Sequence, residues 1–125
     1  MVKNLKIGIS LGLLAILSTL ILQARAELIE VYTWKVFPGK GAQMLETFVA
    51  ARAIHEEMGA RVEIYTENVG TPGRVHYVMM WDSYSDWAGT TAKMSNSKAW
   101  AALAARTNNG LGTLTSSFRA QTLVP

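Results

Sequence analysis

The chain has 125 residues, no cysteine and a formal net charge of +3. The absence of cysteine excludes disulfides, a thiol nucleophile, zinc–thiolate sites and a lipidated cysteine anchor. The positive excess comes from the first 26 residues, which hold Lys3, Lys6 and Arg25 and no acidic residue. In residues 27–125, nine basic residues balance nine acidic ones, so this part lacks the basic surface that a nucleic-acid partner requires.

The N-terminal segment has the three parts of a secretory signal peptide. The basic stretch MVKNLK comes first, residues 7–22 form an apolar run, and Ala24 and Ala26 have the small-residue spacing that precedes a cleavage point. The run has 16 residues, which is short against the roughly 20 of a membrane-spanning helix. We therefore expect cleavage near Ala26 and a periplasmic or secreted protein. An uncleaved membrane anchor is the alternative.

Residues 27–125 have the length of one domain. Residues 27–36 predict a first strand, because β-branched and aromatic residues alternate there and the turn FPGKG ends the pattern. Residues 42–59 predict a helix that ends at a glycine. Its expected apolar stripe consists of Met44, Leu45, Phe48, Ala51, Ile54 and Met58.

Two further strands follow, over residues 60–69 and 74–81. The turn GTPG joins them directly and predicts an antiparallel hairpin. Residues 82–95 predict a second helix that Asp82 or Ser83 caps.

Residues 98–107 predict a short helix capped by Ser97, and residues 113–124 a last strand. The expected period-two face of that strand carries Leu114, Phe118, Ala120 and Val124. The element order β-α-β-β-α-β predicts an α+β fold of the ferredoxin-like kind, a four-stranded antiparallel sheet with helices on one face.

The second face of this sheet must also be satisfied. Tyr32, Trp34 and Tyr65 are not typical of a plain solvent face, so we expect them to meet another sheet or to enclose a pocket. A partner subunit could provide both, because two such sheets placed face to face form a closed barrel.

Two stretches resemble the dimeric α/β-barrel superfamily. They are VYTWKVFPGKGAQMLETF, residues 31–48, and VMMWDSYSDWAG, residues 78–89. The first is most similar to NIPSNAP-like domains, and the superfamily also includes antibiotic-biosynthesis-type monooxygenases. The resemblance implies a homodimer with a pocket between each sheet and its helices or loops. For enzymes it implies cofactor-independent oxygenation of aromatic substrates, and we expect no cofactor and no metal.

Heme-degrading members of the superfamily use an asparagine on the first strand, a tryptophan on the third and a histidine on the second helix. Here residues 27–36 contain no asparagine, and residues 83–107 contain no histidine. Only Trp81 matches the pattern, which argues against heme degradation.

His76 is the candidate general base, because the pKa of histidine lies near neutrality. Tyr65 and Trp81 are the candidates for shaping its pocket. Met80 shares the strand face of His76 and is a candidate for lining that pocket. The alternatives for His76 are an axial heme ligand and a hydrogen-bonded residue of the sheet face.

Other polar and aromatic residues have two interpretations each, one as site residues and one as structural residues. Glu63 and Glu67 flank Tyr65 and could abstract a proton, or they could be solvated. Tyr32 and Trp34 could line an aromatic-binding cavity or fill a core. His55 falls in the stripe of the first helix, where packing is the simpler explanation.

The sequence thus predicts an exported homodimer that binds a small apolar or aromatic molecule, with monooxygenase-like chemistry as its possible activity. One alternative is a non-catalytic binding or structural module, and another is a heme-binding protein that uses His76 or His55. Contact with a membrane is expected only through the signal peptide.

Overall fold

The structure, a computed structural model, describes residues 27–107 and 110–123. The predicted signal peptide lies outside these ranges. The elements, in chain order, are β1 Leu28–Val36, α2 Gly41–Glu57, β2 Arg61–Thr66, β3 Arg74–Trp81, α3 Tyr84–Ser95, α4 Lys98–Thr107 and β4 Gly112–Gln121. The α+β ferredoxin-like fold is confirmed. No helix in these two ranges is long and apolar enough to cross a membrane.

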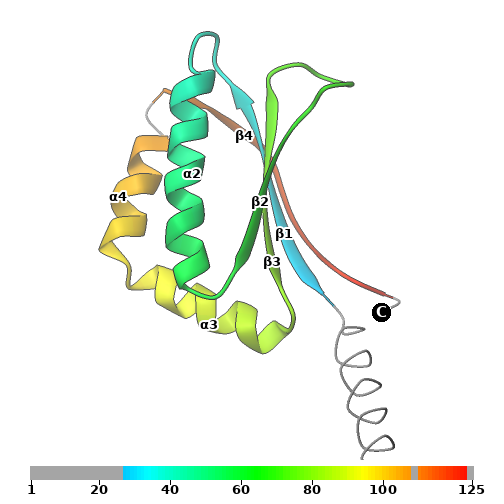
Figure 1. The fold of residues 1–125 in the computed structure, drawn as a ribbon, viewed down its shortest axis with the longest axis vertical. Coiled ribbons are helices and arrows are strands. Elements are labelled where there is room, and N and C mark those ends of the chain that lie inside the picture. The colour runs from blue at the N-terminus through cyan, green and yellow to red at the C-terminus, as the bar shows by residue number, and fades with distance from the viewer. Residues whose placement is uncertain (1–26, 108–109, 124–125) are drawn as a thin grey trace, which may run out of the picture.

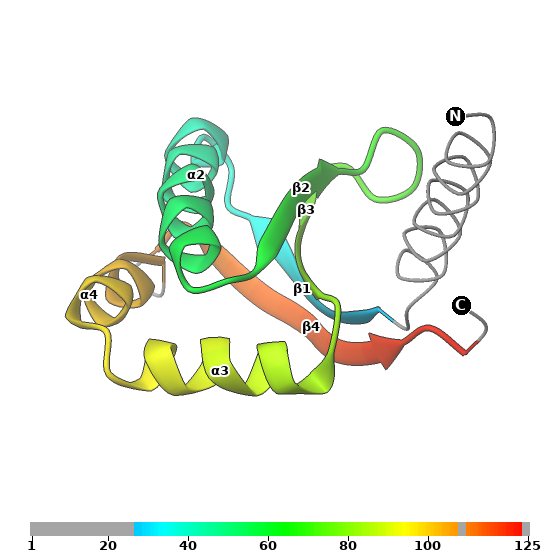
Figure 2. The ribbon, with the colours of Figure 1, turned by 60° about the horizontal axis from the view of Figure 1, so that its bottom comes forward.

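The four strands form one antiparallel sheet in the order β2-β3-β1-β4. The helices lie against one face of it, as Figure 1 and Figure 2 show from two directions. The core lies between this face and the helices, and its largest buried members are Met44, Phe48, Tyr77, Met79, Trp81 and Leu103. The other face, here called the open face, has no helix of the described chain against it.

Helix α2 buries a stripe that differs in part from the predicted one. Met44, Phe48 and Ala51 lie in it as expected, and Thr47 and His55 complete it. Leu45, which was predicted to belong, is 55% exposed. The reason is angular, because one residue along a helix turns the side chain by about 100°, away from the line through Met44 and Phe48.

The strand register corrects the expected grouping of aromatic residues. Tyr32 pairs with Tyr77, and Trp34 contacts Phe48 of α2, so both lie on the helix-covered face. Tyr65 pairs with His76 on the open face. Alternation separates the two faces of a strand but does not say which of them the helices cover.

A β-bulge corrects the predicted face of β4. Thr33 pairs with Ser116, but the next residue, Trp34, pairs with Leu114, so one residue of β4 is unpaired. The extra residue moves Leu114 to the helix-covered face and leaves Phe118 on the open face, 52% exposed. Val124, the last residue of the predicted face, lies outside the described residues.

Buried and terminal hydrogen bonds fix the position of α3. The Trp81 indole N–H donates to Thr90 Oγ1 at 2.9 Å, and this hydroxyl donates to the Met58 carbonyl at 2.8 Å. Ser83 accepts from the Asp86 N–H and caps α3 as predicted, and Ser97 likewise accepts from the Trp100 N–H at the start of α4. The first bond connects β3 to α3, and the second connects α3 to Met58, the residue that follows α2.

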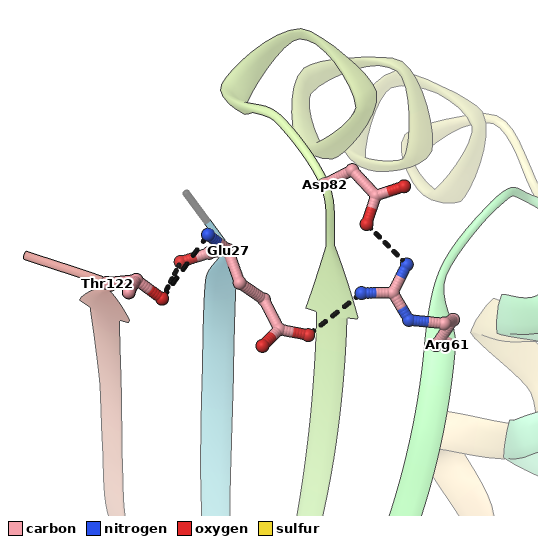
Figure 3. A network of polar contacts seen from close by, with 4 residues as sticks. All are labelled: Glu27, Arg61, Asp82 and Thr122. Carbon is pink, nitrogen blue, oxygen red and sulfur yellow. Dashed lines mark hydrogen bonds and ion pairs between the residues drawn. The ribbon is translucent and has the colours of Figure 1, made fainter. Parts of the chain in front are cut away.

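At one end of the sheet, a polar network joins all four strands, as Figure 3 shows. The Arg61 guanidinium donates to the carboxylates of Glu27 and Asp82, each at 2.8 Å. The backbone N–H of Glu27 donates to Thr122 Oγ1 at 3.3 Å. Because Arg61 is about half exposed, we expect these ion pairs to help align the strands and to add little stability.

Candidate functional site

A cavity of about 450 Å³ lies between the helix-covered face of the sheet and the helices. Its size is typical of small-molecule sites. Residues from all three helices and from β1, β3 and β4 line it: Tyr32, Trp34, Phe48, Ala51, His55, Tyr77, Met79, Met94, Trp100, Ala104, Thr107, Gly112, Thr113 and Leu114.

Aromatic rings form much of the wall. Trp34 meets Phe48 edge-on with ring centroids 6.2 Å apart, and Phe48 lies 5.4 Å from Tyr77. Such contacts hold the rings in fixed orientations. Among the described residues, no acidic or basic side chain other than His55 lines the cavity, so its chemistry favours an uncharged, apolar or aromatic molecule.

The polar centre of the cavity is a pair formed by His55 and Tyr77. His55 Nδ1 lies 2.6 Å from the Tyr77 hydroxyl oxygen, and this contact joins α2 to β3. The two residues are 1% and 4% exposed. The Trp100 ring lies against the imidazole, with centroids 4.3 Å apart. His55 Nε2 is buried and has no hydrogen-bond partner within the described chain.

Burial keeps this pair electrically neutral. It lowers the pKa of His55 to about 4, although the Glu30 carboxylate acts in the opposite direction. Burial also raises the pKa of Tyr77 far above its usual value. At pH 7 the imidazole is therefore unprotonated at one nitrogen, and the phenol keeps its proton.

The hydroxyl of Tyr32, a second tyrosine of the cavity wall, already has a hydrogen-bond partner. Its hydroxyl donates to Glu30 at 2.6 Å, and Glu30 also accepts from the Trp87 indole at 2.5 Å. Arg119 Nε lies 3.4 Å from the Glu30 carboxylate, and Arg119 Cζ lies 4.0 Å from the centroid of the Trp87 ring. Burial, and then the bond to Glu30, raise the pKa of Tyr32. This cluster is satisfied within the protein.

His76 lies on the open face, away from the cavity. Its Nδ1 is 2.9 Å from Thr33 Oγ1, and its Nε2 is 2.9 Å from a carboxylate oxygen of Glu67. Glu67 also accepts from the Thr71 backbone N–H, and this bond, followed by His76, lowers the pKa of Glu67. Both ring nitrogens of His76 therefore have partners.

The predicted site residues divide between the two faces. Tyr32 and Trp34 line the cavity, and Trp81 is buried in the core close to it. The register places the remaining strand candidates on the open face, and Glu67 follows β2; these residues are His76, Tyr65, Glu63, Met80 and Glu67.

For His55, sequence reasoning favoured packing and offered heme ligation as the alternative, so it did not place this residue in the small-molecule site. The available signal was a lone histidine in the buried stripe of a helix, with Thr47, about two turns away, as the other polar residue of that stripe.

Residues 27–107 and 110–123 contain no cluster of side chains that could bind a metal ion. No group of three or more histidine, aspartate or glutamate side chains is placed there to hold an ion. This agrees with the expectation of a metal-free site without testing it.

The fold and the site define a ferredoxin-like α+β domain with an aromatic cavity under its helices. The chain belongs to the NIPSNAP family, whose model matches residues 29–125. No curated protein matches the chain.

Solved structures share the fold at low sequence identity. An uncharacterized NIPSNAP domain protein from Burkholderia xenovorans is 24% identical, with a TM-score of 0.62, over 78% of this chain and 93% of that one. A NIPSNAP family protein from Agrobacterium tumefaciens is 21% identical, with a TM-score of 0.58, over 81% and 87%. SnoaB, a cofactor-independent oxygenase from Streptomyces nogalater, is 15% identical, with a TM-score of 0.58, over 78% and 92%.

The low pKa of His55 predicts a loss of stability in acid. The unfolded chain binds a proton at His55 near pH 6.5, but the folded chain does so only near pH 4. The free energy of unfolding should therefore fall between these pH values, by up to about 3 kcal/mol from this group. Urea titrations of wild type and His55→Leu from pH 7 to pH 4 measure the effect. The wild type should lose more stability than the variant, and parallel pH profiles would contradict a buried neutral imidazole.

Proposed function

We propose that the protein binds one small, uncharged, apolar or aromatic molecule in the cavity of each protomer. The observation that carries this proposal is a cavity of about 450 Å³ walled by aromatic rings, with a neutral His55–Tyr77 pair inside it. The family resemblance also implies a pocket between the sheet and its helices.

Monooxygenase-like catalysis without a cofactor stays a prediction. The likeness to the oxygenase from Streptomyces nogalater supports the fold alone, because the identity is 15%. The predicted roles of His76 as base and of Tyr65 and Trp81 in shaping its pocket are also untested. Since the cavity contains His55 and not His76, we assign the polar role in the proposed binding site to His55.

We further propose a homodimer that pairs the open faces of two sheets. The centre of the open face is an apolar row in which Val31 pairs with Val78 on one side and with Phe118 on the other. Tyr65 extends this surface and is 54% exposed. An apolar sheet face that a second sheet covers is a common way to satisfy both sides of a sheet. Export through the N-terminal signal peptide completes the proposal.

Ligand binding can be tested with fluorene, an uncharged aromatic hydrocarbon, by equilibrium dialysis. The wild type should bind it, and Ala104→Phe should weaken the affinity by about tenfold or more, because the new ring occupies the cavity. Ala105→Phe is the matched control, since Ala105 is the exposed neighbour on the same helix. No binding by the wild type, or equal binding by Ala104→Phe, would contradict the proposal.

The proposed dimer can be tested by sedimentation velocity on residues 27–125. The wild type should sediment as a dimer at micromolar concentration, and Val31→Asp should sediment as a monomer, because it buries a charge in the centre of the interface. Val49→Asp, at an exposed apolar position of α2, should remain dimeric. A monomeric wild type, or a dimeric Val31→Asp, would refute open-face pairing.

A further inference from the structure

His55 Nε2 is a polar atom with an unmet hydrogen-bonding requirement. It is shielded from solvent and has no partner in the described chain. Buried polar groups in native proteins are nearly always hydrogen-bonded, so an unpaired one calls for an explanation. His55 also lines the cavity, where a bound molecule could supply the missing partner.

The bond to Tyr77 indicates which ring nitrogen of His55 carries the proton. Within the described residues, the Tyr77 hydroxyl has one partner, His55 Nδ1, at 2.6 Å. If the hydroxyl donates, its hydrogen is satisfied and the proton of the neutral imidazole lies on Nε2. The opposite arrangement would leave both the Tyr77 hydrogen and the Nε2 lone pair without partners. The tautomer that leaves fewer polar groups without hydrogen-bond partners is therefore the one with an Nε2–H donor.

Two other polar side chains of the cavity wall, Tyr32 and Thr107, are already engaged. Tyr32 donates to Glu30, and the Thr107 hydroxyl donates to the Leu103 carbonyl at 3.2 Å. The Nε2–H is thus a buried donor that remains uncommitted. Because burial also keeps the imidazole neutral at pH 7, it can donate without requiring a negative charge on the ligand.

We propose that the ligand carries a neutral acceptor oxygen, such as a ring carbonyl, which accepts a hydrogen bond from His55 Nε2. This inference rests on the proposed binding function and narrows its ligand class. Nε2 is closed to solvent, so a neighbouring side chain must shift to admit the oxygen. Trp100 is half-buried, lines the cavity and lies against the imidazole, so we assign this movement to its ring.

Fluorenone and fluorene test the proposal, because they differ only in a carbonyl and a methylene at one position. In water the carbonyl is hydrogen-bonded, so a cavity without a donor should prefer fluorene. Equilibrium dialysis should show that the wild type binds fluorenone about fivefold or more tightly than fluorene, which is the effect of one added neutral hydrogen bond. In His55→Leu the ratio of the two affinities should fall to one or reverse, because the donor is gone.

The carbonyl stretch of bound fluorenone provides a second readout, which does not depend on the folding of any variant. In the wild type the infrared band should shift to lower frequency than in an apolar solvent, as a hydrogen-bonded carbonyl does. Fluorene binding that equals or exceeds fluorenone binding, with an unshifted band, would overturn this inference and leave the proposed function standing. If neither compound binds, the proposed function itself is overturned.

Discussion

A buried hydrogen bond between His55 and Tyr77 is the interaction on which the candidate site depends. It joins helix α2 to strand β3 and supplies the polar centre of the cavity wall. Burial keeps both partners neutral, and the geometry leaves one imidazole nitrogen without a partner. The neutral chemistry of the cavity and the proposed ligand class follow from this pair.

The two faces of the sheet have different proposed roles. Neighbouring residues along a strand point to opposite faces and therefore serve different roles. On β3, Tyr77 and Met79 face the helices and line the cavity, while His76 and Met80 face the other way. The register aligns these alternations across the sheet, so the aromatic cavity and the apolar pairing surface lie on opposite faces of the same sheet. A one-residue slip would exchange the two sets, which makes the register a constraint on both roles.

Alternation, turns and helix caps were sufficient to predict the fold, because they are local signals. Ser83 and Ser97 cap the helices as expected, and the order of elements defines the sheet topology. The site was only partly predictable. Tyr32 and Trp34 were expected at a cavity, but alternation could not show that it lies under the helices. The β4 bulge and the contact between His55 and Tyr77 depend on pairing between distant segments, which a sequence pattern does not contain.

The most direct test of a small-molecule site under the helices is NMR of the protein with ¹³C-labelled methionine methyl groups and bound fluorene. Met79 and Met94 line the cavity, whereas Met80, adjacent in sequence to Met79, lies on the open face. The proposed site predicts nuclear Overhauser effects from fluorene to the methyl groups of Met79 and Met94, and none to Met80. Contacts to Met80 alone would place the ligand on the open face and contradict the proposed site.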